Sequence, residues 1–307
     1  MRDDLRLFAI WGDGLLLAMA PMMLSRRPGR LPFCTRERQF LGADMNLTEL
    51  RGMLAKPGWE AATATAKAQH LATRREWEWD WVQWHGLPAD GPVPPGIDLN
   101  GGVDDFVLYL SSDWASFRAH LPRNIKESLR KCYNALQRDG HAWTVRVLQG
   151  RSAVPALQQL VTMHKQRASR NDTIRHDDVF ADPRAQGFMA DYVQQTPGAW
   201  LFALDIAGQP VAMRLGFVYD RELYLYYSGY DQAWAQHSVM TTLVSEALRW
   251  AIDAGLERVN LSTGADVSKL RWRPTAVPAR SGTQLGPGRR RRLAFQLTQA
   301  LRQSRWQ

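Results

Sequence analysis

The stretch that decides the fold covers residues 199–262 and reads AWLFALDIAGQPVAMRLGFVYDRELYLYYSGYDQAWAQHSVMTTLVSEALRWAIDAGLERVNLS. It predicts three consecutive strands, at 199–206, 209–219 and 222–230, because Ala207-Gly208 and Asp220-Arg221 supply tight turns between apolar runs. A helix over 238–254 follows, with an apolar stripe at helical spacing and Gly255 as its stop. One more strand is expected at 258–262. The pattern therefore predicts an antiparallel meander, a helix and a returning strand.

The residues before this stretch extend the order of elements. Residues 113–138 predict one strongly basic helix, and residues 143–148 alternate as a strand. Two further helices are expected at 154–167 and 183–195. The order of strand, two helices, meander, helix and strand predicts an α/β (α+β) fold in which a mixed, mostly antiparallel sheet is flanked by helices.

Several short motifs in this order resemble one family. They are Tyr226-Tyr227-Ser228-Gly229-Tyr230-Asp231, Ala235-Gln236-His237-Ser238-Val239, the glycines Gly255 and Gly264, and Lys269-Leu270-Arg271-Trp272. Upstream, the basic run over 123–131 with Gly140, and the segment 160–167, extend the likeness. The set resembles GNAT acyltransferases, in particular the BioF-type, CelD-like branch associated with cellulose and exopolysaccharide loci, and more distantly the Fem-type peptidyltransferases. The resemblance implies two GNAT-like halves, of which the first is incomplete here.

Two positions depart from the pattern of that branch. Met240 stands where typical members have a glycine in the phosphate-binding turn. The usual Asp-x-x-Arg-Gly run before the lysine is here Asn260-Leu261-Ser262-Thr263-Gly264, so its acid and its arginine are missing. These departures keep open a catalytically degenerate GNAT scaffold.

We expect three parts along the chain. Residues 1–100 are a degenerate first half and linker, with strands at 5–11, 14–24 and 77–84, a helix at 59–71, and a linker at 86–102 rich in proline and glycine. Residues 101–273 are the acyltransferase domain. Residues 274–307 are a basic tail, expected to be loose over 274–292.

Composition restricts the partners and the compartment. The net charge is +9, but residues 274–307 hold seven arginines and no acid, so subtracting them leaves the body at +2. We therefore expect no specific nucleic-acid partner, and at most a weak contact of the tail with an anionic surface. Cys34 and Cys132 stand far apart with no CxxC motif, which predicts neither a disulfide framework nor a metal site. The longest apolar run, 15–24, is too short to span a bilayer, and no signal peptide is evident, so a cytoplasmic protein is expected.

The resemblance also implies a site. Acetyl-CoA or another acyl-CoA is the expected co-substrate, and its pyrophosphate would lie at the start of the helix near Ser238, where unpaired N–H groups and the helix dipole favour anions. The cofactor-binding residues implied are Gln236, His237, Ser238, Val239, Met240 and Thr241. Ser238 is explained equally well as a helix N-cap. His237 is expected to be a solvent-facing loop residue and not a catalyst.

The candidate catalytic residues are Tyr227, Asp231 and His164. Tyr227 is a candidate proton donor to the leaving thiolate, or a buried aromatic; as neighbours on a strand, Tyr226 and Tyr227 are expected on opposite faces. Asp231 is a candidate base or a turn-stabilising residue, and His164 a candidate base or a core histidine. Lys269 and Arg271 are candidate contacts for phosphate or acceptor. Neither cysteine is expected near the site, which favours direct transfer to an amine or hydroxyl of a small molecule or saccharide. A Fem-like transferase that uses aminoacyl-tRNA is the alternative.

Overall fold

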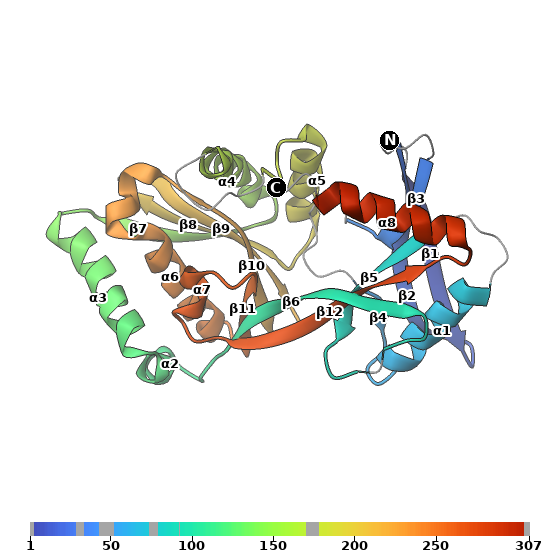
Figure 1. Cartoon of the computed structure of the whole chain (residues 1–307). Coiled ribbons are helices and arrows are strands. Elements are labelled where there is room, and N and C mark those ends of the chain that lie inside the picture. Colours follow the sequence, from blue (N-terminus) through green and yellow to red (C-terminus); the bar gives the residue numbers. More distant parts are fainter. Residues whose placement is uncertain are drawn as a thin grey trace. The chain divides into compact units, whose positions relative to one another are not determined.

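The computed structural model describes residues 3–28, 34–42, 52–73, 79–91, 93–169 and 178–303. The chain divides into two compact units, one formed by Met1–Asp104 together with Pro278–Gln307, and the other by Asp105–Val277. The second unit therefore holds almost all of the expected acyltransferase domain, and we describe each unit by itself (Figure 1).

The second unit is built on a sheet that contains the expected meander. In pairing order its strands are β6 (Ile97–Tyr109, which enters from the first unit), β11 (Arg258–Thr263), β10 (Glu222–Tyr230), β9 (Gln209–Tyr219), β8 (Ala199–Ile206) and β7 (Trp143–Gln149). All neighbours pair antiparallel except β10 and β11, which are parallel. The parallel pair is possible because a helix connects the two strands, as a parallel connection requires.

Helices cover both faces of this sheet. α4 (Ala153–Ala168) and α5 (Pro183–Gln195) lie on one face, and α3 (Arg123–Arg138) and α6 (Val239–Asp253) lie on the other (Figure 1). The apolar stripe expected for α6 is buried in the main core, together with one face of α3. The core residues that these two helices contribute include Ile125, Leu129, Leu136, Leu243, Ala247 and Ala251.

The basic segment before β7 differs from expectation. It was predicted as one helix over 113–138 and is two, α2 (Trp114–His120) and α3, separated at Leu121-Pro122. Proline disfavours a helical conformation in the residue before it, and Leu121 is extended, with φ −63° and ψ 147°. The break re-aims α3, whose basic residues reach the site described below.

The first unit has its own sheet and core. Its strands pair in the order β1 (Asp3–Gly12), β2 (Leu15–Pro28), β3 (Cys34–Phe40), β5 (Trp81–Pro88) and β12 (Thr275–Leu285), with β4 (Leu54–Ala55) beside β2. The helix α1 (Glu60–Thr73) packs on one face through Ala64, Ala68 and Leu71. Val82 belongs to this core, whereas its neighbour Trp81 faces the other side, where its ring lies 5.4 Å from Phe295 of α8 (Arg289–Gln303).

The expectation of a loose C-terminal segment is wrong. Instead of being irregular, residues 275–285 form β12, which pairs with β5 from Ala279 opposite Pro88 to Leu285 opposite Trp81. The helix α8 is held by the Phe295–Trp81 contact and by Arg291, whose Nε lies 3.4 Å from the Asp80 carboxylate. The C-terminal segment is therefore structural, because it completes the sheet of the first unit.

Two other expectations for the first unit need correction. The expected linker over 86–102 is mostly strand, because β5 continues to Pro88 and β6 begins at Ile97. The strand expected over 77–84 begins at Trp81, while Trp77 and Glu78 lie outside the described residues. None of the helices within the described ranges combines the length and the apolar character needed to cross a membrane.

Candidate active site

The central feature of the second unit is an opening between two parallel strands. β10 and β11 pair only over Glu222–Tyr224 and Arg258–Asn260. Past that point both strands are irregular, since β11 shifts register against β6 between Asn260 and Thr263, and β10 shifts against β9 between Leu225 and Ser228. β-Bulges of this kind re-aim side chains and backbone groups next to active sites.

The bulge in β10 places its two tyrosines together. Tyr226 and Tyr227 were expected on opposite faces, but their ring centroids are 4.1 Å apart, because two residues here oppose a single residue of β9. Tyr227 is buried against Phe180 and His164, at centroid distances of 4.8 and 5.8 Å. Both tyrosine rings therefore lie on the side of the sheet covered by α4.

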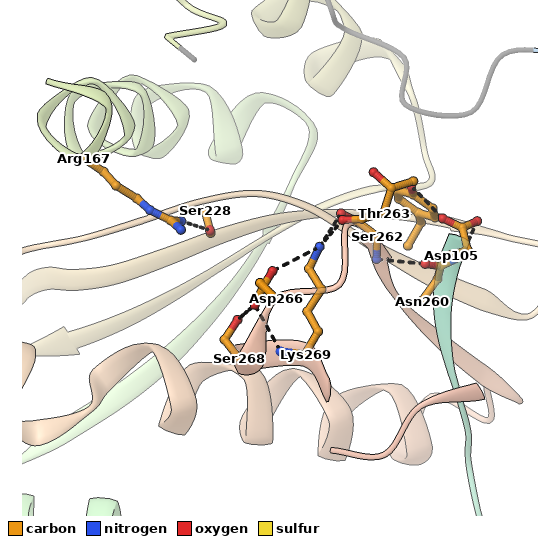
Figure 2. A network of polar contacts seen from close by, with 10 residues as sticks. Asp105, Arg167, Ser228, Asn260, Ser262, Thr263, Asp266, Ser268 and Lys269 are labelled. Carbon is orange, nitrogen blue, oxygen red and sulfur yellow. Dashed lines mark hydrogen bonds and ion pairs between the residues drawn. The ribbon is translucent and has the colours of Figure 1, made fainter. Parts of the chain in front are cut away.

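α4 lies unusually close to the end of β10. A Cβ at Gly229 would come within 2.6 Å of the Met163 Cβ, so only glycine allows this approach. Here His164 Nδ1 is 3.3 Å from the Ser228 carbonyl oxygen. Arg167 Nη1 is 3.4 Å from Ser228 Oγ (Figure 2). The fold thus brings two of the candidate catalytic residues, His164 and Tyr227, together at the bulge, whereas Asp231 is not part of this cluster.

Asp231 begins the turn that leads from β10 to α6. Its carboxylate accepts the Ala233 N–H at 3.0 Å and so caps the short 3-10 helix Gln232–His237. This is the turn-stabilising arrangement that the sequence left open beside a catalytic role.

His237, expected to face solvent, is instead buried, with 5% of its surface exposed. Its Nε2 lies 3.0 Å from Asp139, at the end of α3. Arg138 and His237 together lower the pKa of Asp139 to about 2, so the carboxylate is ionised and accepts the Nε2 proton. This pair fixes the turn before α6 against α3.

The start of α6 presents free backbone donors. Ser238 is left-handed, with φ 51°, and its side chain makes no capping bond. Thr241 and Thr242 N–H both donate to the Ser238 carbonyl, so the preceding N–H groups of Val239 and Met240 have no acceptor within the helix. A left-handed non-glycine residue at this point is a strained feature of the kind found at ligand sites.

A pocket of about 600 Å³ lies between this turn and α3. Gln236, His237 and Ser238 form one wall. The other wall comes from α3 and includes three cations, Arg130, Lys131 and Arg138. A helix N-terminus faced by three cations favours a ligand with several negative charges.

Cys132 also lines this pocket, so the expectation that neither cysteine lies near the site is wrong. Its thiol is buried next to the Ser238 and Ser128 hydroxyls, and burial raises its pKa. Ser128 also accepts a hydrogen bond from Arg271, one of the expected substrate contacts. Arg271 therefore lies beside the pocket, because its partner Ser128 is one of the α3 residues that line it.

Lys269, the other expected contact, lies at the β11 side of the opening (Figure 2). Its Nζ donates to the Thr263 carbonyl, is 3.3 Å from Ser262 Oγ and 3.6 Å from the Asp266 carboxylate. Together with Met240, Thr241 and Arg214, it lines a small cavity of about 40 Å³ between α6 and β11. Val239, by contrast, is fully buried in the core.

A polar network at the base of the opening was not foreseen. Asn260 donates its side-chain amide to Asp105 of β6 and to Glu222 of β10, each at 3.1 Å. Its own amide oxygen accepts the Ser262 N–H at 2.8 Å (Figure 2). Asp105 lies far upstream in the sequence, in a region expected to be a linker boundary, so no local motif pointed to it.

Comparisons with known proteins agree with this arrangement. Residues 123–270 match the family model of the acetyltransferase (GNAT) domain. No curated protein matches the chain. Among solved structures, it is similar to FemX, with 9% identity over 96% of this chain and 90% of that chain, and a TM-score of 0.64. It is also similar to L-PGS from Bacillus licheniformis, with 14% identity over 93% and 86% of the two chains and a TM-score of 0.61. At such identities the likeness concerns the fold, and it confirms the expected fold class.

Proposed function

We propose that this chain, which carries a GNAT acetyltransferase domain over residues 123–270, moves an acetyl or other acyl group from acyl-CoA to an amine or hydroxyl acceptor. The acceptor we propose is a small molecule or a saccharide, in polysaccharide or cell-envelope biosynthesis. Because acyl-CoA is made in the cytoplasm, we place the reaction there.

The observation that carries this proposal is the pocket at the start of α6. Acyl-CoA brings a pyrophosphate and a third phosphate, and the pocket sets the residues just before α6, Gln236 to Ser238, opposite Arg130, Lys131 and Arg138. The pantetheine arm is an extended chain with two amides, which suits unpaired strand backbone. β10 and β11 offer such backbone beyond Tyr224 and Asn260. A donor anchored at the pocket would therefore place its thioester between the two strands.

Three groups near the opening suit acyl transfer. Tyr227 and His164 lie together at the β10 bulge. Lys269, on the short helix α7 (Val267–Leu270), bonds to Ser262 and Thr263 at the end of β11. Direct attack on the thioester needs positioning, polarisation of the carbonyl and modest proton transfer. The raised pKa of Cys132 argues against a covalent cysteine intermediate, since the thiolate is the nucleophilic form.

A second candidate is a Fem-like transferase that takes its acyl group from aminoacyl-tRNA. It is favoured by the similarity of both units to FemX and L-PGS. The cations of α3 suit RNA phosphates as well as those of CoA. Charge does not count against this candidate, because residues 274–307, which hold seven arginines and no acid, include β12 and α8 of the folded first unit, and the whole chain carries +9.

The donor is tested by calorimetric titration with CoA, acetyl-CoA, longer acyl-CoAs and aminoacyl-tRNA. We expect micromolar or tighter binding of an acyl-CoA and, for Arg130→Glu, a loss of about 10- to 100-fold, the scale of a lost charged hydrogen bond. Arg123→Glu is the matched control, because Arg123 lies on the same helix but is exposed and outside the pocket. Equal losses of affinity in the two variants would mean that the change in net charge, and not a contact in the pocket, causes the effect. Binding of aminoacyl-tRNA alone would favour the second candidate, and binding of neither donor would favour a degenerate scaffold.

A further inference from the structure

Asp105 is a buried carboxylate of β6, with 6% of its surface exposed. It stands opposite Thr263 in the irregular part of β11. Its Oδ2 accepts the Asn260 amide at 3.1 Å, and its Oδ1 is 3.5 Å from the Tyr224 hydroxyl. A carboxylate this deeply buried is costly unless it is well held, and at functional sites such groups serve as acids and bases.

The two residues that hold Asp105 mark the base of the opening. Tyr224 and Asn260 are the last paired residues before β10 and β11 part. A donor that enters from the α6 end and runs between the strands brings its acyl group toward the point where the two strands part. Asp105 therefore lies at the reacting end of the proposed donor site, opposite the phosphate pocket.

The frame around Asp105 is rigid. Asn260 is fixed by three hydrogen bonds, two through its amide group to Asp105 and Glu222, and one from the Ser262 N–H. Ser262 is left-handed, with φ 72°, a conformation that costs free energy in a non-glycine residue. The bulge and this strain keep the Asn260 amide aimed at the carboxylate.

The other charged groups nearby are held by their own partners. Glu222 accepts Arg258 Nε at 2.9 Å, so its carboxylate is committed to a guanidinium. Lys269 lies beyond Ser262 and donates to Thr263. Asp105 accepts hydrogen bonds from a neutral amide and a neutral hydroxyl, those of Asn260 and Tyr224.

We propose that Asp105 takes the proton of the attacking nucleophile, an inference that rests on the proposed acyl transfer. The nitrogen or oxygen of the acceptor bonds to the carbonyl carbon, its proton passes to the Asp105 carboxylate, and the carbon–sulfur bond breaks. The leaving thiolate takes a proton from solvent, and Asp105 returns its own to solvent. The residue thus supplies from β6 the acid that is missing from the Asn260–Gly264 run.

The test compares two buried carboxylates of the same unit. Asp105→Asn keeps the shape and removes the base. Asp205→Asn is the matched control, since Asp205 is also 6% exposed but lies on β8, paired with Arg146. Acyl-CoA affinity is measured by calorimetry, and turnover by thioester loss with a panel of small amines and amino sugars across pH.

For Asp105→Asn we expect turnover to fall by about 10²- to 10⁴-fold, with acyl-CoA affinity unchanged and the acid limb of the pH profile lost. Asp205→Asn should keep both turnover and the acid limb. In case Asp105→Asn does not fold, Tyr224→Phe retains the carboxylate. The acid limb of the pH profile of Tyr224→Phe should move to higher pH, because the Asp105 carboxylate loses a hydrogen bond that stabilises its charge.

Unchanged turnover or an unchanged acid limb in Asp105→Asn would overturn the assignment, as would an acid limb of Tyr224→Phe that stays in place. If the wild-type protein neither binds nor consumes any acyl-CoA, the proposed donor is wrong instead, and the role of Asp105 as base for it falls as well.

Discussion

Replacing Lys67 by methionine is expected to stabilise the protein at neutral pH. Lys67 lies on α1 with 2% of its surface exposed, and its Nζ has no hydrogen-bond partner among the described residues. The ammonium instead faces the rings of Phe40 and Trp84, at 4.4 and 4.5 Å from their centroids. Burial, and secondarily the charge of Arg38, lower its pKa from 10.5 to about 7.

The magnitude follows from that pKa. Below pH 7 the amine is protonated in both the folded and the unfolded state, and the folded state bears the whole cost of the buried charge, about 5 kcal/mol at 1.36 kcal/mol per pH unit. Cation–π attraction between the ammonium and the two rings offsets about 2 kcal/mol of this free-energy cost. Methionine has a similar length and no charge, so Lys67→Met should raise the free energy of unfolding by about 1–3 kcal/mol at pH 7.

The sign of the pH dependence is also determined. Between pH 7 and 10.5 the unfolded chain binds a proton that the folded protein does not, so wild-type stability rises with pH. The advantage of Lys67→Met should therefore shrink over this range and vanish above it. Urea unfolding followed by tryptophan fluorescence at pH 7, 8, 9 and 10 measures this, with the exposed Lys56→Met as control. A Lys67→Met protein that is less stable at pH 7, or whose advantage does not change with pH, would refute the reasoning.

Three further predictions concern the pocket and the C-terminal segment. Ser238→Glu should weaken acyl-CoA binding by about 1–3 kcal/mol in a calorimetric titration, because it sets a carboxylate against the phosphates, whereas Ser238→Asn, which tolerates the left-handed conformation, should bind nearly as wild type. Phe295→Ala should lower the free energy of unfolding by about 1–3 kcal/mol, because its ring packs on Trp81. Removal of residues 274–307 should unfold the first unit, because it deletes β12. Thermal melts measure both, and an unchanged melt after truncation would contradict the observed pairing of β12. Cys132→Ala should keep turnover within a few-fold in steady-state assays, since the buried thiol resists ionisation, and ping-pong kinetics or lost activity would show a covalent role.

Local patterns in the sequence were enough for the elements of the meander and for α6. Their strands and turns are neighbours along the chain, so periodicity and turn residues define them. The strand β12 was missed because its partner β5 lies about 200 residues upstream, and Pro278 and Gly282 mimic a loop. The break of the basic helix, by contrast, has a local cause in the sequence, because Pro122 disfavours a helical conformation at Leu121.

The expected cofactor site rests on one element, whereas the pocket in the folded chain is built from two. The family resemblance and the physics of helix N-termini point only to the turn before α6. The basic character of α3 was also visible, but not that Arg130, Lys131 and Arg138 face that turn. Buried His237 is hydrogen-bonded through its Nε2 to the carboxylate of Asp139, 98 residues away, and no spacing along the chain encodes that pair.

Asp105 shows most clearly why a motif can mislead. In the sequence, Asn260 reads as the loss of an acid, and that loss argued for a degenerate enzyme. In the folded chain, the Asn260 amide is hydrogen-bonded to a carboxylate contributed by the neighbouring strand, at 3.1 Å. Because antiparallel pairing of β6 with β11 sets Asp105 opposite Thr263, an acid on either strand reaches the same point of the opening. If Asp105 acts as proposed, the acid absent from the Asn260–Gly264 run is supplied by the neighbouring strand, and loss of turnover in Asp105→Asn is the result that would show it.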